Sequence, residues 1–92
     1  MRDDEFEWDD SKAVRIFRDH GITFEMARLA FHDPDCINRE DPDPDEERFS
    51  RLCRHGYRVF VVVWTLRGNR IRIISARPAN KHEQEIYFRQ EA

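Results

Sequence analysis

The spacing of hydrophobic positions changes twice along the chain, which predicts two helices, then a set of strands, then a last helix. Asp9 or Asp10 can cap the first helix, and Gly21 suits the left-handed position after its end. Thr23 can cap the second helix, which must end before Pro34. The apolar positions of this predicted helical hairpin are Ala13, Val14, Ile16, Phe17, Met26, Ala27, Ala30 and Phe31.

Alternating apolar and polar residues then predict three strands, over residues 49–53, 58–67 and 70–77. The last two are joined by the two-residue turn Gly68-Asn69, so an antiparallel meander is expected. Residues 6–8 form a brief extended start, at the other end of the chain.

Two further segments have clear local signals. Residues 40–47 combine two prolines with six acids, so they cannot form a central strand and predict an exposed loop. Asn80 can cap the last helix, with Glu83 completing a capping box and Ile86, Tyr87 and Phe88 on the apolar side.

The two-residue turn also predicts a register, because opposite residues share a face of the sheet. The expected pairs are Arg67 with Arg70, Thr65 with Arg72, Val63 with Ile74, and Phe60 with Arg77. The face toward the helices would then hold Leu66, Trp64, Val62, Phe60, Ile71, Ile73, Ser75 and Arg77. If Gly56-Tyr57 is a tight turn as well, Arg48 lies beside Thr65 and Glu46 beside Arg67.

The pattern therefore predicts an α+β fold, with a small antiparallel sheet packed against the N-terminal helical hairpin and a C-terminal helix. Its 92 residues indicate a single domain over residues 1–92. Cys36 and Cys53 have no second Cys near either of them, so they are expected to be reduced thiols in neither a disulfide framework nor a zinc site. The acidic start and the lack of a long apolar run predict a cytoplasmic protein without a membrane span.

Charge is distributed unevenly along the sequence. Residues 1–47 hold 6 Lys or Arg against 16 Asp or Glu, whereas residues 48–92 hold 10 against 3, so segments of charge −10 and +7 give the net charge of −3. Such asymmetry favours a polyanionic partner that the total charge would not suggest. Arginines on one half-exposed sheet face could bind phosphate, although a solvated face is the alternative.

Several segments of this sequence, in order and over nearly the whole chain, resemble the BrnT toxin family. They are Phe6-Glu7-Trp8-Asp9, Lys12, His20-Gly21, Phe24-Glu25, Phe31, Asp33-Pro34, Glu47-Arg48-Phe49, the run from Ile71 to Arg77, Glu83 and Tyr87. The resemblance implies a RelE-like toxin domain that cleaves RNA until a BrnA-like antitoxin binds it. It also implies that the antitoxin carries a ribbon-helix-helix part and that the pair binds operator DNA through it.

RNA cleavage without a metal needs a base, a stabilised phosphorane and an acid for the leaving oxygen. No metal site and no cofactor are expected, since no His or Cys pair has ligand spacing. Glu47 or His20 could be the base, and His20 or Tyr87 the acid. Phosphate would be held by Arg48, Arg72 and Arg77, with Arg67, Arg70, Lys12 and Trp8 as further RNA contacts.

Each of these residues also has a structural explanation. Arg77 could instead pair with Glu83, His20 could complement a helix end, and Lys12 could be a solvated surface residue. Trp8 and Tyr87 could belong to the core.

The sequence departs from the family pattern at three places, which leaves two function classes open. Asp19 replaces the usual lysine before His-Gly, Ile16 replaces an asparagine, and Pro44-Asp45 replaces His-Ser before the Glu-Arg pair. One class is an endoribonuclease that inhibits translation. The other is a binding module that keeps the antitoxin interface and acts as a co-repressor.

Overall fold

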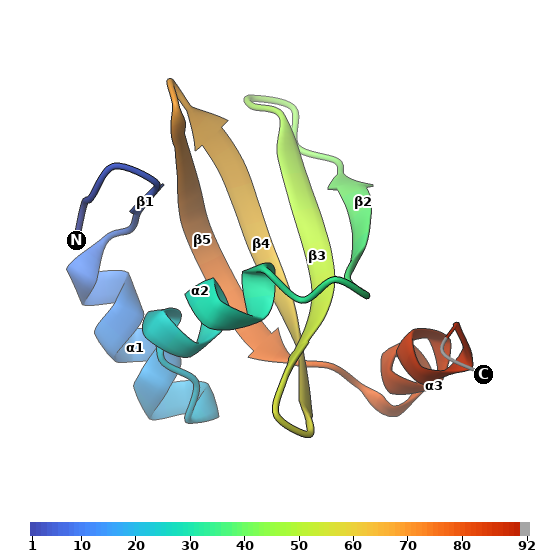
Figure 1. Cartoon of the computed structure of the whole chain (residues 1–92). Helices are drawn as coiled ribbons and strands as arrows, with labels where there is room; N and C mark the ends of the chain where they lie inside the picture. Colours follow the sequence, from blue (N-terminus) through green and yellow to red (C-terminus); the bar gives the residue numbers. More distant parts are fainter. Residues whose placement is uncertain (91–92) are drawn as a thin grey trace.

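The computed structural model, described here for residues 1–90, has one five-stranded sheet with three helices (Figure 1). The strand order is β1-β5-β4-β3-β2. The elements are β1 (Phe6–Glu7), α1 (Asp10–His20), α2 (Phe24–Phe31), β2 (Ile37–Asp41), β3 (Arg48–His55), β4 (Arg58–Arg67), β5 (Arg70–Pro78) and α3 (Lys81–Arg89). The predicted α+β fold, its helical hairpin and its C-terminal helix are confirmed.

The helix boundaries follow from caps that the sequence predicted. The side chains of Asp9 and Thr23 accept hydrogen bonds from the backbone N–H of Lys12 and Met26 at the starts of α1 and α2. Gly21 ends α1 at φ 67°, in the left-handed region where glycine has no Cβ penalty. Asn80 and Glu83 form the predicted capping box at α3.

The sheet is antiparallel except at one edge, where β1 runs parallel to β5. Strand β2 at the other edge is a correction, because Glu40 and Asp41 belong to it and not to the loop. Its sequence INRED has one aliphatic residue and no alternation of apolar and polar residues that would predict a strand. Its pairing with β3 holds it in place, and an edge strand can carry such charges.

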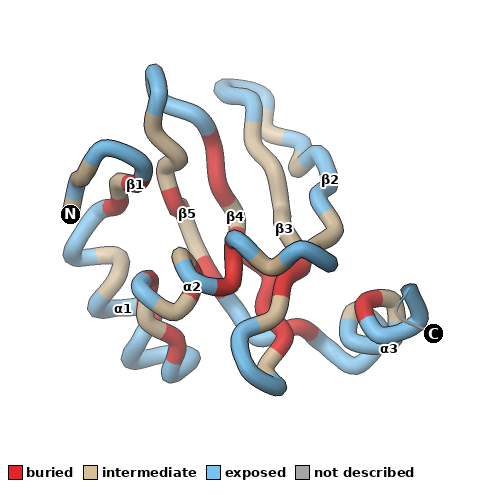
Figure 2. The backbone as a smooth tube through the Cα atoms, viewed as in Figure 1, coloured by how far each residue is buried: buried red, intermediate tan, exposed pale blue. Residues whose placement is uncertain are grey.

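The main core lies between the sheet and the hairpin, where Figure 2 shows buried segments of β4, β5 and α2 facing each other. The buried set is Phe6, Trp8, Ile16, Ile22, Phe24, Ala27, Ala30, Phe31, Cys53, Phe60, Val62, Trp64, Ile73 and Ala76. Val14, Phe17 and Leu66 were expected to face this core and instead are 68%, 55% and 59% exposed. Val14 and Phe17 lie on the outer side of α1, and Leu66 lies next to the β4–β5 turn.

A second, smaller core forms under α3 on the opposite face of the sheet. It contains Leu52, Val59, Val61, Ala79 and Tyr87. Helix α3 contacts mainly β3 and lies at one end of the sheet (Figure 1).

A bulge in β5 corrects the predicted register beyond Thr65. Thr65 pairs with Arg72 and Trp64 with Ile73, but Val63 then pairs with Ser75, so Ile74 is the extra residue. Phe60 pairs with Pro78 instead of Arg77. Since one extra residue reverses the faces, Ala76 enters the core, while Ser75 and Arg77 move to the side of the sheet that carries Arg72.

Candidate RNA-binding face

The face of the sheet opposite the helical hairpin carries one row of polar residues that crosses all five strands. Glu7 pairs with Arg72, Arg72 with Thr65, and Asp41 with Arg48. Arg48 lies one step beyond the Phe49–Trp64 pair, which puts it beside Thr65 as predicted. We call Glu7, Arg72, Thr65, Arg48 and Asp41 the cross-strand stripe.

The two arginines of the stripe lie two strand spacings apart, so their Cα atoms are roughly 10 Å from each other. Thr65, between them, is buried and donates its hydroxyl hydrogen to the Glu47 carbonyl oxygen. This bond fixes the start of β3, and with it Arg48, against the centre of the sheet. The arrangement leaves two guanidinium groups on one side of the sheet.

Each arginine of the stripe has an acidic partner. Arg72 Nη1 lies 2.8 Å from Glu7 Oε2, and Arg48 Nη1 lies 2.8 Å from Asp43 Oδ2. Hydrogen bonds from the Asp45 and Glu46 backbone N–H and from Arg48 hold the pKa of Asp43 below its ordinary value. Both arginine side chains stay about a quarter exposed, so an incoming phosphate can reach them and compete with the carboxylates.

Lys12 on α1 joins this cluster of cations. Burial lowers its pKa first, and the charges of Arg15, Arg48 and Arg72 lower it further. The three arginines therefore lie within electrostatic reach of Lys12, while the charge of Asp9 acts in the opposite direction. Among the residues expected from the sequence, the structure brings together Arg48, Arg72 and Lys12. Glu47 precedes Arg48 in the chain and lines a hollow with it before β3.

Arg77 lies on the same face but farther along the strands. It pairs with Val61 while Arg72 pairs with Thr65, four residues along β4 or roughly 13 Å at the strand rise. Its guanidinium makes two hydrogen bonds to Glu83, of 2.8 and 2.9 Å, which lower the pKa of Glu83. The ion pair with Glu83, which was the structural alternative for Arg77, is therefore present and links the sheet to α3. The Arg77 side chain is nevertheless 45% exposed.

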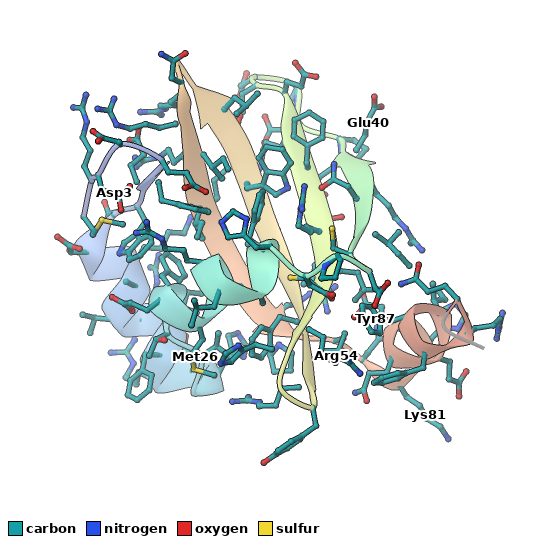
Figure 3. The ribbon with its side chains drawn as sticks, viewed as in Figure 1. Asp3, Met26, Glu40, Arg54, Lys81 and Tyr87 are labelled. Atoms are coloured by element: carbon teal, nitrogen blue, oxygen red, sulfur yellow. The ribbon has the colours of Figure 1, made fainter. Side chains whose placement is uncertain are left out.

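Three expected residues lie apart from the stripe. Trp8 is 5% exposed and packs edge-on against Phe24, so its ring is enclosed in the core. Tyr87 is fully buried and donates its hydroxyl hydrogen to Asp33 Oδ2. Figure 3 shows Tyr87 on the side of α3 that faces Arg54. His20 ends α1, eight residues or roughly 12 Å along the axis from Lys12.

The arginines near the β4–β5 turn differ from each other. Arg67 is exposed and faces Arg70 across the sheet, as predicted. Arg70 Nε donates to the Asp3 carbonyl oxygen at 2.7 Å, which turns its side chain toward the N-terminal segment. Glu46 was expected beside Arg67, yet it lies in the loop before β3, 4.0 Å from Arg48 Nε. Arg67 thus remains exposed to solvent, whereas Arg70 has a structural role.

Arg15 was missed as a candidate, although the sequence contained a signal for it. Lys12, Arg15 and Arg18 follow each other at intervals of three on α1, a spacing that puts them on neighbouring turns of one side. They line a shallow hollow of about 430 Å³ together with Asp9, Ser11 and Val14. This basic side of α1 extends the positive surface beyond the sheet.

Two departures from the family pattern have a visible structural setting. Ile16 is buried in the main core, where an asparagine would need a hydrogen-bonding partner. Asp19 is exposed, and its Oδ1 lies 3.5 Å from Arg18 Nε. Asp19 thus weakens the positive charge at the C-terminal end of α1, away from Lys12.

The fold and this face define a small α+β protein with a cationic surface suited to a polyanion. The chain belongs to the BrnT family, because the family model described as ribonuclease toxin, BrnT, of type II toxin-antitoxin system matches residues 8–83. Membership in a type II system implies an antitoxin partner. No curated protein matches the sequence. Among the described residues, no helix is long and apolar enough to cross a membrane.

Proposed function

We propose that this protein is an endoribonuclease that binds single-stranded RNA across the cross-strand stripe and cuts it without a metal ion. The observation that carries the proposal is that Lys12 of α1 lies near Arg48 and Arg72 of the cross-strand stripe. Planar guanidinium groups bind phosphate oxygens in pairs and stabilise the extra charge of a phosphorane. Family membership supports RNA as the substrate.

Glu47 is our candidate for the general base. It is exposed, it precedes Arg48 in the chain, and its backbone is fixed by Thr65. Its carboxylate can take the proton from a ribose 2′-hydroxyl whose neighbouring phosphate lies on Arg48. The 2′-oxygen then attacks the phosphorus, which leads to a 2′,3′-cyclic phosphate when the bond to the 5′-oxygen breaks.

Lys12 fits the role of the acid better than His20 or Tyr87. A leaving 5′-oxygen needs a proton from a group beside the phosphate. Lys12 is the candidate whose pKa is lowered by the charges of both Arg48 and Arg72. Its lowered pKa brings the ammonium closer to the range in which it gives up a proton. Tyr87 is enclosed in the second core, and His20 lies at the far end of α1.

The partner we propose is a BrnA-like ribbon-helix-helix antitoxin in the cytoplasm, through which the pair would bind operator DNA. The type II system supports a protein antitoxin. The proposal predicts that a short neighbouring gene encodes a ribbon-helix-helix protein, and that its product abolishes RNA cleavage when it is mixed with this protein.

The second candidate function is a binding module that represses its operon without cutting RNA. It is favoured by the acidic partners of the stripe, since Glu7 and Asp43 already neutralise Arg72 and Arg48. In this case the arginine face would only meet the antitoxin. The two functions differ in whether the free protein stops translation.

Growth of a bacterial host on induction of this chain distinguishes the two. We expect arrest by the wild type and relief by Arg48→Ala combined with Arg72→Ala, with soluble and folded protein in both cases by circular dichroism. Arg89→Ala, at the exposed end of α3, is the matched control and should still cause arrest. No arrest by soluble wild-type protein would favour the binding module.

A further inference from the structure

Cys36 and Cys53 lie next to the last residue pair of strands β2 and β3, Cys36 just before β2 and Cys53 within β3. Ile37 pairs with Leu52 at the end of this antiparallel ladder. Cys36 directly precedes Ile37 and Cys53 directly follows Leu52, so the same register puts the two cysteines opposite one another. Both pack into the main core. Directly opposed residues in antiparallel strands have Cα atoms about 4.5–5.5 Å apart, within the range that a disulfide spans.

The surroundings of the two thiols differ in a way that sets an order of reaction. Cys36 is half-buried, and Arg51 Nη1 lies 3.0 Å from its sulfur. The Cys36 sulfur therefore lies beside a guanidinium and is less enclosed than Cys53. Cys53 is fully buried, and burial, followed by the charge of Cys36, raises the pKa of Cys53 to about 12. Cys53 is therefore shielded from oxidants and poorly ionised.

Arg51 is held in place by contacts of its own. Its Nη1 also donates to the Phe31 carbonyl oxygen at 2.9 Å, and its guanidinium carbon lies 3.8 Å from the centre of the Phe31 ring. The Arg51 Nε atom is buried without a hydrogen-bond partner. These contacts hold the guanidinium against the Cys36 sulfur.

We propose that Cys36 and Cys53 form a peroxide-sensitive dithiol site, in which Cys36 is oxidised first and Cys53 then closes a disulfide. In the first step the Cys36 thiolate attacks hydrogen peroxide. An S–O bond forms, the O–O bond breaks and hydroxide leaves to become water, so Cys36 becomes a sulfenic acid and the peroxide is reduced. In the second step the Cys53 sulfur attacks the Cys36 sulfur. The S–O bond breaks, and the hydroxide departs as water with the Cys53 proton.

The structural consequence would be a covalent link between an edge strand and its neighbour. The closed segment runs from Cys36 to Cys53 and includes β2, the acidic loop and Arg48. Strand β2 otherwise depends on its pairing with β3 and carries Asp41 of the stripe. Oxidation would thus stabilise the half of the sheet that supports Arg48.

The test is intact mass spectrometry of the purified full-length protein after brief exposure to hydrogen peroxide. We expect the wild type to lose the mass of two hydrogens, to have no alkylatable thiol when unfolded, and to recover both thiols with dithiothreitol. A non-reduced digest should contain the Cys36 and Cys53 peptides joined. The melting temperature should rise by roughly 12–24 °C, as a loop of this length suggests.

The variants test the order of reaction. Cys53→Ser should trap a sulfenic acid on Cys36 that dimedone labels, and Cys36→Ser should leave Cys53 unoxidised under the same conditions. Cys53→Ser could disturb the core, because Cys53 is buried. The digest of the wild-type protein tests for the disulfide without this variant. Two free thiols in peroxide-treated wild type, or a disulfide only between two molecules, would overturn the proposal.

Discussion

Arg48, Arg72, Lys12 and Glu47 carry the proposed chemistry, and the three cations among them would let a protein of net charge −3 bind RNA. The acids of the N-terminal segment are not spread at random, because Glu7 and Asp43 contact the arginines directly. These carboxylates hold the guanidinium groups in place before RNA arrives. RNA phosphates must then replace these carboxylates. The affinity for RNA therefore depends on the difference in free energy between arginine–phosphate and arginine–carboxylate pairs.

Lys12 should give the pH dependence of cleavage its basic limb. An acid must be protonated to act, so the rate falls once pH rises above its pKa. Because the pKa of Lys12 lies below the ordinary lysine value of 10.5, the fall should begin below that pH. Replacing Lys12 with Ala should reduce kcat by about 10² to 10⁴, the usual contribution of such a group. Single-turnover cleavage assays at a series of pH values measure both the pH at which the rate falls and the loss of rate in Lys12→Ala.

A Lys12→Arg variant is the control for charge alone. It should keep RNA affinity close to that of the wild type but lose most of the rate, since an arginine gives up its proton too reluctantly. Equal rates for Lys12→Arg and the wild type at every pH would show that Lys12 only attracts RNA.

Asp3 should make the stability of the N-terminal segment depend on pH. Its carboxylate accepts hydrogen bonds from the backbone N–H groups of Phe6 and Glu5 and pairs with Arg28, which together lower its pKa from 3.8 to about 2. A lowered carboxyl pKa stabilises the folded state above the unfolded value, and this is lost as pH falls through the folded value. Asp3→Asn should therefore lower the melting temperature by a few degrees at pH 7. The two proteins should converge between about pH 4 and pH 2, and a constant difference over that range would argue against this role.

The elements show where the sequence was informative and where it was not. Caps at Asp9, Thr23 and Asn80 were readable because a side-chain oxygen and a local backbone N–H are enough to make them. The turn at Gly68-Asn69 likewise fixed the pairing of Arg67 with Arg70. These signals are local, and they placed most helix and strand ends within one or two residues.

The errors came from long-range effects. The bulge at Ile74 is a feature of how β5 pairs with β4, and nothing in RIRIISAR marks which residue is extra. As a result, Arg77 was predicted on the wrong face. Strand β2 escaped notice because its pairing with β3, and not its own composition, makes it a strand. The Glu7–Arg72 ion pair depends on the parallel β1–β5 pairing, which sequence spacing does not reveal.

Helix α3 should depend strongly on its capping box. Asn80 accepts a hydrogen bond from the Glu83 N–H, and Glu83 Oε1 accepts one from the Asn80 N–H while it holds Arg77. Asn80→Ala should cost about 1 kcal/mol, which for a domain of this size lowers the melting temperature by roughly 4–8 °C. Lys81→Ala, on the next and exposed residue, should change it by less than about 1 °C. Equal shifts in the two variants would contradict the role of the box.

The charge of the whole protein is best probed by salt. Each phosphate contact to a single strand contributes a slope of about −0.7 to log K against log salt concentration. Using RNA with 2′-O-methyl groups to prevent cleavage, we expect Arg48→Ala combined with Arg72→Ala to make the slope shallower by about 1.4. The Arg89→Ala control should leave it unchanged. An unaltered slope in the double variant would place the RNA on another surface, such as the basic side of α1 alone.

The central claim is that the cross-strand stripe cuts RNA, and the most direct measurement is the single-turnover cleavage rate of a 5′-labelled RNA by the purified, antitoxin-free protein in EDTA. We expect cleavage with 2′,3′-cyclic phosphate ends by the wild type and by Arg89→Ala. Arg48→Ala and Arg72→Ala should each lower the rate by about 10² to 10³, the usual effect of removing one stabilising donor. Equal rates in the wild type and in folded stripe variants, or no cleavage by the folded wild type, would contradict the account.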